Sequence, residues 1–184
     1  LFNNNTKELS QDFIHFVFDL TEGNVQKIEE LMFYIKKHNY LDDDKKEYLN
    51  APRDIYSLIL FHFKEMNENQ MKIAKILSCL SPNVSLDFLQ KALPDIDMLA
   101  ELKNMSENKL VKFDLKVNKI LVSLAKKNYA QILSEMITKE ELCDIHKKIA
   151  KAYQVCYAHC LSNYYQRLAY HYEQANMTDE AIYY

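Results

Sequence analysis

Glycine, proline and tryptophan are scarce or absent in this sequence. Its 184 residues include one glycine, three prolines and no tryptophan. Because tight turns and β-hairpins depend on glycine and proline, this composition argues against a largely β protein and predicts a mainly α fold. Tyrosine and phenylalanine, with 13 and 9 residues, must then fill much of the core.

Long apolar runs and a large excess of one charge are also missing. No run approaches the roughly 20 apolar residues that span a bilayer, and no signal peptide is visible. The net charge of −3 gives no general attraction to nucleic acid or anionic lipid. Four cysteines in a chain of this size do not indicate a disulfide framework. These observations predict a cytoplasmic protein that binds neither membrane nor nucleic acid. Because the first residue is Leu, we expect a segment of a longer protein.

Apolar residues recur at helical spacing along most of the chain. This spacing predicts one buried face formed by Val25, Ile28, Leu31, Met32 and Ile35. A second face, which opens the next part of the chain, is formed by Ile55, Leu58, Ile59, His62 and Met66. Similar faces follow at Ile73, Ile76, Leu77 and Leu80, and at Leu99, Leu102 and Met105. Ser85 is expected to cap a short helix that Pro94 stops.

The period changes near residue 110. Residues 110–115 and 120–122 are rich in β-prone side chains and predict a small hairpin. Helices followed by such a hairpin have the order of a winged helix. Beyond it the pattern is helical again, with a capping box at Thr138 and Glu141 and a left-handed turn residue at Asn176. We therefore predict three parts, at 1–50, 51–123 and 124–184.

Several motifs resemble those of STAND-type, AAA-related signal-transduction ATPases. Gly23-Asn24 followed by IEEL at 28–31 is similar to the segment that closes their nucleotide-binding module. FLxxxLP from Phe88 resembles their winged helix, and LAYHYEQANMTDEAIYY from Leu168 resembles their first tetratricopeptide-like (TPR-like) hairpin. The motifs occur in the family's order, and their closest likeness is to the C-terminal region of the soluble adenylyl cyclases.

The resemblance implies a regulatory segment of a multidomain ATPase in cAMP signalling. Residues 1–50 would end the ATPase helical subdomain, 51–123 would form the winged helix, and 124–184 would begin the TPR-like repeats. Such a segment couples nucleotide state to a partner or effector domain by packing against the upstream nucleotide-binding domain of the same chain. ATP and magnesium would bind in that domain, and no cofactor is expected in these residues.

Gly23 and Asn24 are the candidate nucleotide-sensing residues under this resemblance. Val25 stands where the family has a proline. The alternative is that Gly23 only supplies a positive-φ turn between two helices. The wider alternatives are a TPR-like scaffold and a transcription regulator, each with a degenerate ATPase region.

Catalytic and metal-binding patterns are not found. A P-loop needs two glycines, and no nucleophile, base and orienting residue stand at a supporting spacing. The strongest constellation pairs Cys143 and His146 with Cys156, His159 and Cys160, which could supply zinc ligands. No knuckle-forming Gly or Pro flanks either group, so we interpret these cysteines as structural and predict neither a catalytic residue nor a metal site.

Two further patterns concern binding partners. The predicted recognition helix of the winged helix, at 95–109, carries more acidic residues than lysines, which disfavours DNA. Tyrosines gather near the C-terminal end, and they either stack inside a helical-repeat core or form a surface for a protein partner. The candidates for partner binding are Tyr164, Tyr165, Tyr170 and Tyr172.

Overall fold

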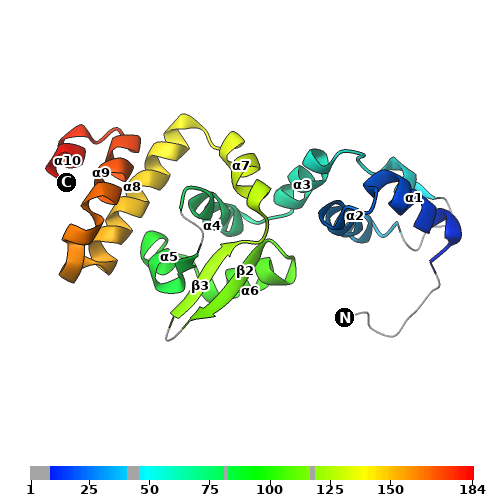
Figure 1. Ribbon diagram of the computed structural model, residues 1–184, viewed down its shortest axis with the longest axis horizontal. Helices are drawn as coiled ribbons and strands as arrows, with labels where there is room; N and C mark the ends of the chain where they lie inside the picture. The colour runs from blue at the N-terminus through cyan, green and yellow to red at the C-terminus, as the bar shows by residue number, and fades with distance from the viewer. Residues whose placement is uncertain (1–8, 41–45, 81–82, 117–118) are drawn as a thin grey trace. The chain divides into compact units, whose positions relative to one another are not determined.

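The structure is a computed structural model, and it describes residues 9–40, 46–80, 83–116 and 119–184 (Figure 1). The described chain is mainly helical with a small antiparallel sheet, which confirms the predicted fold class. The chain divides into two compact units, Leu1–Glu65 and Met66–Tyr184. Each unit is described by itself.

The first unit contains the helices α1 (Gln11–Thr21), α2 (Val25–Lys37) and α3 (Ile55–Lys64), and the short 3₁₀ helix η1 (Glu47–Asn50). Each α-helix begins at a polar side chain that accepts a hydrogen bond from the first turn, since Ser10, Asn24 and Asp54 are the N-caps. The core of the unit consists of Phe13, Leu31, Ile35, Tyr48, Ala51 and Leu58.

The boundary of this unit differs from the predicted division after residue 50. Helix α3 packs against α2 and belongs to the first compact unit, whereas the sequence pattern placed it with the winged helix. The resemblance also assigns residues 1–50, 51–123 and 124–184 to three different domains of the family, and this assignment stays a prediction.

The second unit begins with helices arranged around a small sheet. Its elements are α4 (Glu68–Ser78), β1 (Val84–Ser85), α5 (Leu86–Ala92), α6 (Met98–Glu107), β2 (Val111–Lys116) and β3 (Lys119–Leu124). The strands lie in the order β1–β3–β2 and all pairs are antiparallel. Helix, strand, two helices and a hairpin is the order of a winged helix. The sequence pattern missed β1, because two residues are too few to show a strand period.

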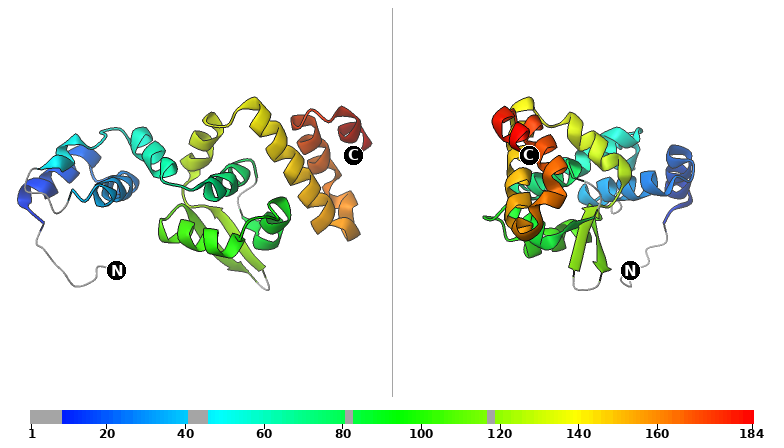
Figure 2. Two further views of the ribbon diagram at one scale, coloured as in Figure 1. Left: turned by 180° about the vertical axis from the view of Figure 1, so that it is seen from behind. Right: turned by 60° about the vertical axis from the view of Figure 1, so that its left-hand side comes forward.

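The chain after the sheet is helical. Its helices are α7 (Lys127–Glu135), α8 (Lys139–Cys156), η2 (Ala158–Tyr164), α9 (Tyr165–Gln174) and α10 (Thr178–Tyr183). Helix α7 packs on α4, whereas α9 packs on α8 and α10 packs on α9. Both views in Figure 2 show α9 lying alongside α8. Between α9 and α10, Asn176 has φ +56° and the Met177 amide donates to the Tyr172 carbonyl, so the predicted left-handed turn is confirmed.

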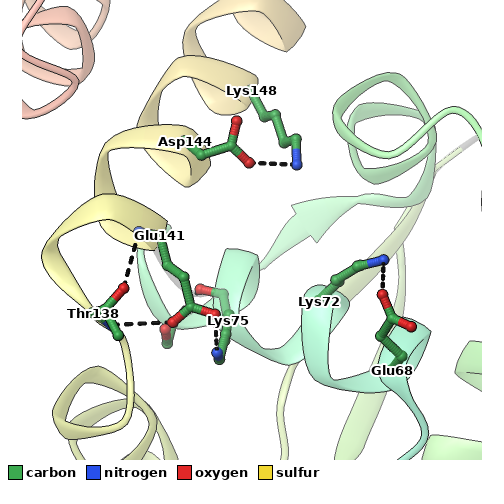
Figure 3. A network of polar contacts seen from close by, with 8 residues as sticks. Glu68, Lys72, Lys75, Thr138, Glu141, Asp144 and Lys148 are labelled. Carbon is green, nitrogen blue, oxygen red and sulfur yellow. Dashed lines mark hydrogen bonds and ion pairs between the residues drawn. The ribbon is translucent and has the colours of Figure 1, made fainter.

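An ion pair joins the N-terminal turn of helix α8 to helix α4 (Figure 3). The Thr138 hydroxyl accepts from the Glu141 amide at 3.2 Å, and the Glu141 carboxylate accepts from the Thr138 amide at 3.1 Å. This is the predicted capping box. Glu141 also forms a 2.8 Å ion pair with Lys75 of α4, which holds the pKa of its carboxyl below the usual value. One residue therefore caps a helix and links it to its neighbour.

Two predicted core positions are exposed. Val25 is 70% exposed and Leu99 is 66% exposed, although both match the apolar spacing of their helices. Each stands in the first turn of its helix, where the chain is only starting to approach the core. In the described ranges, no helix is both long and apolar enough to cross a membrane.

Candidate functional site

The turn at Gly23 and Asn24 joins α1 to α2. Gly23 has φ +76°, a region that favours glycine, and a Cβ added there would meet nothing within 4 Å. The glycine is therefore explained by the backbone angle alone, as the conformational interpretation predicts. Asn24 caps α2, because its Oδ1 accepts from the Lys27 amide at 3.0 Å. The Lys27 ammonium donates to the Leu20 carbonyl, and a shallow hollow lies beside the turn.

Glu30, within the IEEL motif, makes a buried contact that the sequence pattern did not predict. Its Oε2 lies 2.8 Å from Nδ1 of His62 on α3, and the two residues are 2% and 3% exposed. The His62 ring also stacks on Phe33 with 3.7 Å between centroids. Nε2 of His62 is buried and has no hydrogen-bond partner among the described residues. This pair joins α2 to α3 across 32 positions of sequence.

The four candidate tyrosines do not share one surface. Tyr172 is buried and stacks on Tyr184, with 5.8 Å between ring centroids. Tyr164 is half-buried and stacks on Tyr157 at 4.0 Å. Tyr165 and Tyr170 are exposed. Both sequence-based interpretations therefore apply, the core interpretation to Tyr172 and the surface one to Tyr165 and Tyr170, and partner binding itself stays a prediction.

Aromatic rings in contact with one another connect α5, α8 and η2. Phe88 of α5 contacts Tyr153 of α8 edge-on at 4.8 Å, and Tyr153 in turn contacts Tyr157 and Tyr164. Burial, with smaller contributions from neighbouring tyrosines, raises the pKa of Tyr157 to about 12. The Tyr157 hydroxyl therefore loses its proton only in strongly alkaline solution.

A groove of about 600 Å³ opens beside these rings. One side comes from the junction of β1 with α5 and from the start of β3, and the other from the end of α8 and from η2. The lining residues are Ser85, Leu86, Asp87, Lys119, Ile120, Cys156, Tyr157, His159, Cys160 and Tyr164. Asp87 accepts a weak hydrogen bond from the Cys156 thiol, with 3.8 Å between sulfur and oxygen. Burial, followed by the charge of Asp87, raises the pKa of that thiol, which keeps it a poor nucleophile.

The two Cys/His groups do not converge. The Cys143 sulfur accepts from the Asn176 side chain at 3.1 Å, and His146 is buried against α9, whereas Cys156, His159 and Cys160 lie at the groove. Within the part of the chain that the structure describes, no group of three or more His, Cys, Asp or Glu residues could hold a metal ion.

A pair of buried histidines joins α8 to α9. Nδ1 of His146 lies 2.9 Å from Nδ1 of His171, so one ring donates its N–H to the lone pair of the other. Burial lowers the pKa of both rings, and for His171 the charges of His146 and Arg167 add to this effect and bring the pKa to about 4. The Tyr153 and Tyr170 rings enclose His171. Both histidines are therefore neutral at pH 7.

The chain matches no family model and no curated protein. The likeness to STAND-type ATPases thus depends on the motifs of the sequence.

Proposed function

We propose that the chain is a non-catalytic regulatory segment of a STAND-type ATPase of the soluble adenylyl cyclase kind. In this proposal it couples the nucleotide state of an upstream domain to a partner or effector domain. The supporting observation is the arrangement of the second unit, where a winged-helix order of elements is followed by α7 and then by the packed helix pairs α8–α9 and α9–α10. The motifs of the sequence occur in the order that the resemblance implies.

The nucleotide-facing part of this proposal is the turn at Gly23 and Asn24. The positive end of the helix dipole at an N-terminus favours a phosphate, and the turn presents the start of α2 beside a hollow. Asn24 is the residue to change, because aspartate also caps helices well but adds a negative charge.

The test is association with the nucleotide-binding domain of the same protein, added in trans. We expect the purified chain to bind that domain with affinities that differ by about tenfold between ATP and ADP, which corresponds to a coupling of ~1.4 kcal/mol. Isothermal titration measures both affinities. Equal affinities in the two nucleotides, or no association, would defeat the coupling role.

Two matched variants locate the effect. Asn24→Asp should abolish the nucleotide dependence while circular dichroism shows an unchanged helix content. Ser10→Asp introduces the same charge at another N-cap of the same unit, at the start of α1, and should leave the dependence intact. Loss of the dependence in both variants would place its origin outside the turn.

A TPR-like scaffold is the second candidate, and one observation favours it. On α10, Ile182 and Tyr183 are 79% and 78% exposed, an unusual amount of apolar surface for neighbouring residues. In this alternative the two residues bind a protein partner, whatever nucleotide is present. The scaffold is favoured if the chain binds the nucleotide-binding domain with equal affinity in ATP and in ADP, and if the double variant Ile182→Ser/Tyr183→Ser no longer binds it.

A further inference from the structure

Strand β2 forms one edge of the small sheet, and its outer side is open. The strand order β1–β3–β2 leaves β3 as the one strand that pairs with β2 among the described residues. Alternate residues of an antiparallel strand point their backbone N–H and C=O groups away from the partner strand. Within the described ranges, no backbone hydrogen bond apart from those with β3 reaches residues 112–116. An open edge of this length can accept a further strand.

Both faces of this edge strand are also exposed. Every residue of β2 after the first is exposed, including Phe113 at 43% and Leu115 at 79%. These two apolar side chains share one face, because successive residues of a strand point to opposite faces. The other face carries the charges of Lys112, Asp114 and Lys116. None of these three charged side chains forms an ion pair with another described residue.

The sequence of β2 is complementary to itself in an antiparallel pair. In a two-fold pair centred on Phe113, Lys112 of each copy lies opposite Asp114 of the other, so two pairs of opposite charge form. On the other face the two Phe113 rings meet, and each Leu115 lies opposite a Val111. A wholly acidic or wholly basic partner strand would instead place a like charge opposite one of the two charged positions.

Other two-fold registers of the same strand fit less well. A pair centred on Asp114 would bring two carboxylates together and would place Lys112 opposite Lys116. A pair centred on Leu115 would use a shorter part of the strand, because β2 ends one residue later. The register centred on Phe113 therefore combines opposite charges with the longest ladder.

We propose that the open edge of β2 pairs with the same edge of a second copy of this chain, in the antiparallel register centred on Phe113. The sheet then continues from one copy into the other. Pairing of one short strand buries less surface than a stable dimer needs, so the association is weak, with a Kd on the order of 100 µM. This surface is separate from the Gly23 turn and from α10, and the inference does not depend on the proposed function.

Sedimentation equilibrium of the full chain, between about 10 µM and 1 mM, measures the association. We expect a monomer–dimer equilibrium that Lys112→Glu weakens about tenfold, because two opposed pairs in each dimer change from attraction to repulsion. Lys151→Glu makes the same charge change at an exposed position of α8 and should leave the Kd within about twofold. Circular dichroism checks that the variants fold. A chain that stays monomeric at 1 mM, or an unchanged Kd in Lys112→Glu, overturns the proposal.

Exchange of the two charges tests the register. Asp114→Lys should also weaken the dimer about tenfold, whereas the double variant Lys112→Glu/Asp114→Lys should restore the Kd to within about threefold, since opposite charges face each other again. A mixture of the two single variants should form mixed dimers, because one strand is then negative and the other positive at both positions. If neither the double variant nor the mixture associates, the two residues do not face each other and the proposal is wrong.

Strand pairing has its own readout in hydrogen exchange. The outward-pointing amides of β2 should exchange more slowly at 1 mM than at 10 µM, because the dimer protects them. In Lys112→Glu this concentration dependence should be much smaller. Dimerisation that leaves the exchange of β2 unchanged would place the interface on another surface and would contradict the proposal.

Discussion

At the residue scale, the buried contact between Glu30 and His62 matters most for the first unit. Removing one partner of a buried pair leaves the other polar group without that hydrogen bond, in a place where water cannot replace it. We expect Glu30→Ala to lower the free energy of unfolding by about 3 kcal/mol, measured by urea denaturation of the full chain. The double variant Glu30→Leu/His62→Leu should cost less than Glu30→Ala, because both polar groups are then gone.

An exposed carboxylate of the same unit provides the control for this prediction. Asp19→Ala, on α1, should change the unfolding free energy by no more than about 0.5 kcal/mol, as expected for a surface substitution. A loss in Glu30→Ala as small as that of Asp19→Ala would show that the buried pair contributes nothing measurable to stability.

His146 and His171 predict a pH dependence with a definite sign. The pKa of His171 is near 4 in the folded chain, while an unperturbed histidine titrates near 6.5. Below pH 6.5 the unfolded chain therefore binds more protons, and stability present above pH 6.5 is lost as the pH falls towards 4. Between pH 7 and pH 5 we expect a loss of about 2 kcal/mol from this residue.

Urea denaturation at pH 7 and pH 5 measures this loss, and His171→Gln isolates it from other titrating groups. The variant should show a smaller drop than the unchanged chain over the same interval. His159→Gln replaces a histidine at the groove and should keep the full drop. If His171→Gln loses as much stability as the unchanged chain, the histidine pair is not the cause.

At the scale of elements, the capping box of α8 is the most local determinant of structure in the second unit. Thr138→Ala removes the acceptor for the Glu141 amide and should lower the unfolding free energy by about 1 kcal/mol. Thr138→Ser keeps a hydroxyl at the N-cap and should restore most of that loss. Equal destabilisation by alanine and serine would indicate that the lost methyl group, and not the cap, determines the effect.

Helix caps and the turn after α9 could be predicted from the sequence, because each involves residues only a few positions apart. The Ser85 cap, the Thr138 capping box and the left-handed Asn176 were all predicted and are present. Helical spacing also found most buried faces. It failed at Val25 and Leu99, since periodicity gives the direction of a side chain but not whether another element covers the first turn of its helix.

At the scale of the whole molecule, the features missed by the sequence analysis are the non-local ones. The Glu30 contact joins residues 32 positions apart, and no local pattern distinguishes Glu30 from Glu29. The groove collects residues from three separate stretches, near 85–87, 119–120 and 156–164. Tyr170 and Tyr172 lie on opposite sides of α9, because two residues turn a helix by about 200°. Which of the two sides is covered depends on the packing of α9, and it is Tyr172 that is buried.

One residue belongs to two kinds of structure at once. Ser85 is paired with Leu121 in the sheet and is also the N-cap of α5, with its hydroxyl accepting from the Phe88 amide. No spacer separates strand from helix, so an inserted residue after Ser85 would turn α5 by about 100° relative to the sheet. Phe88 and Leu89 would then rotate out of the interior. Over evolutionary time, the length of this junction should therefore be kept more strictly than the identity of the residues around it.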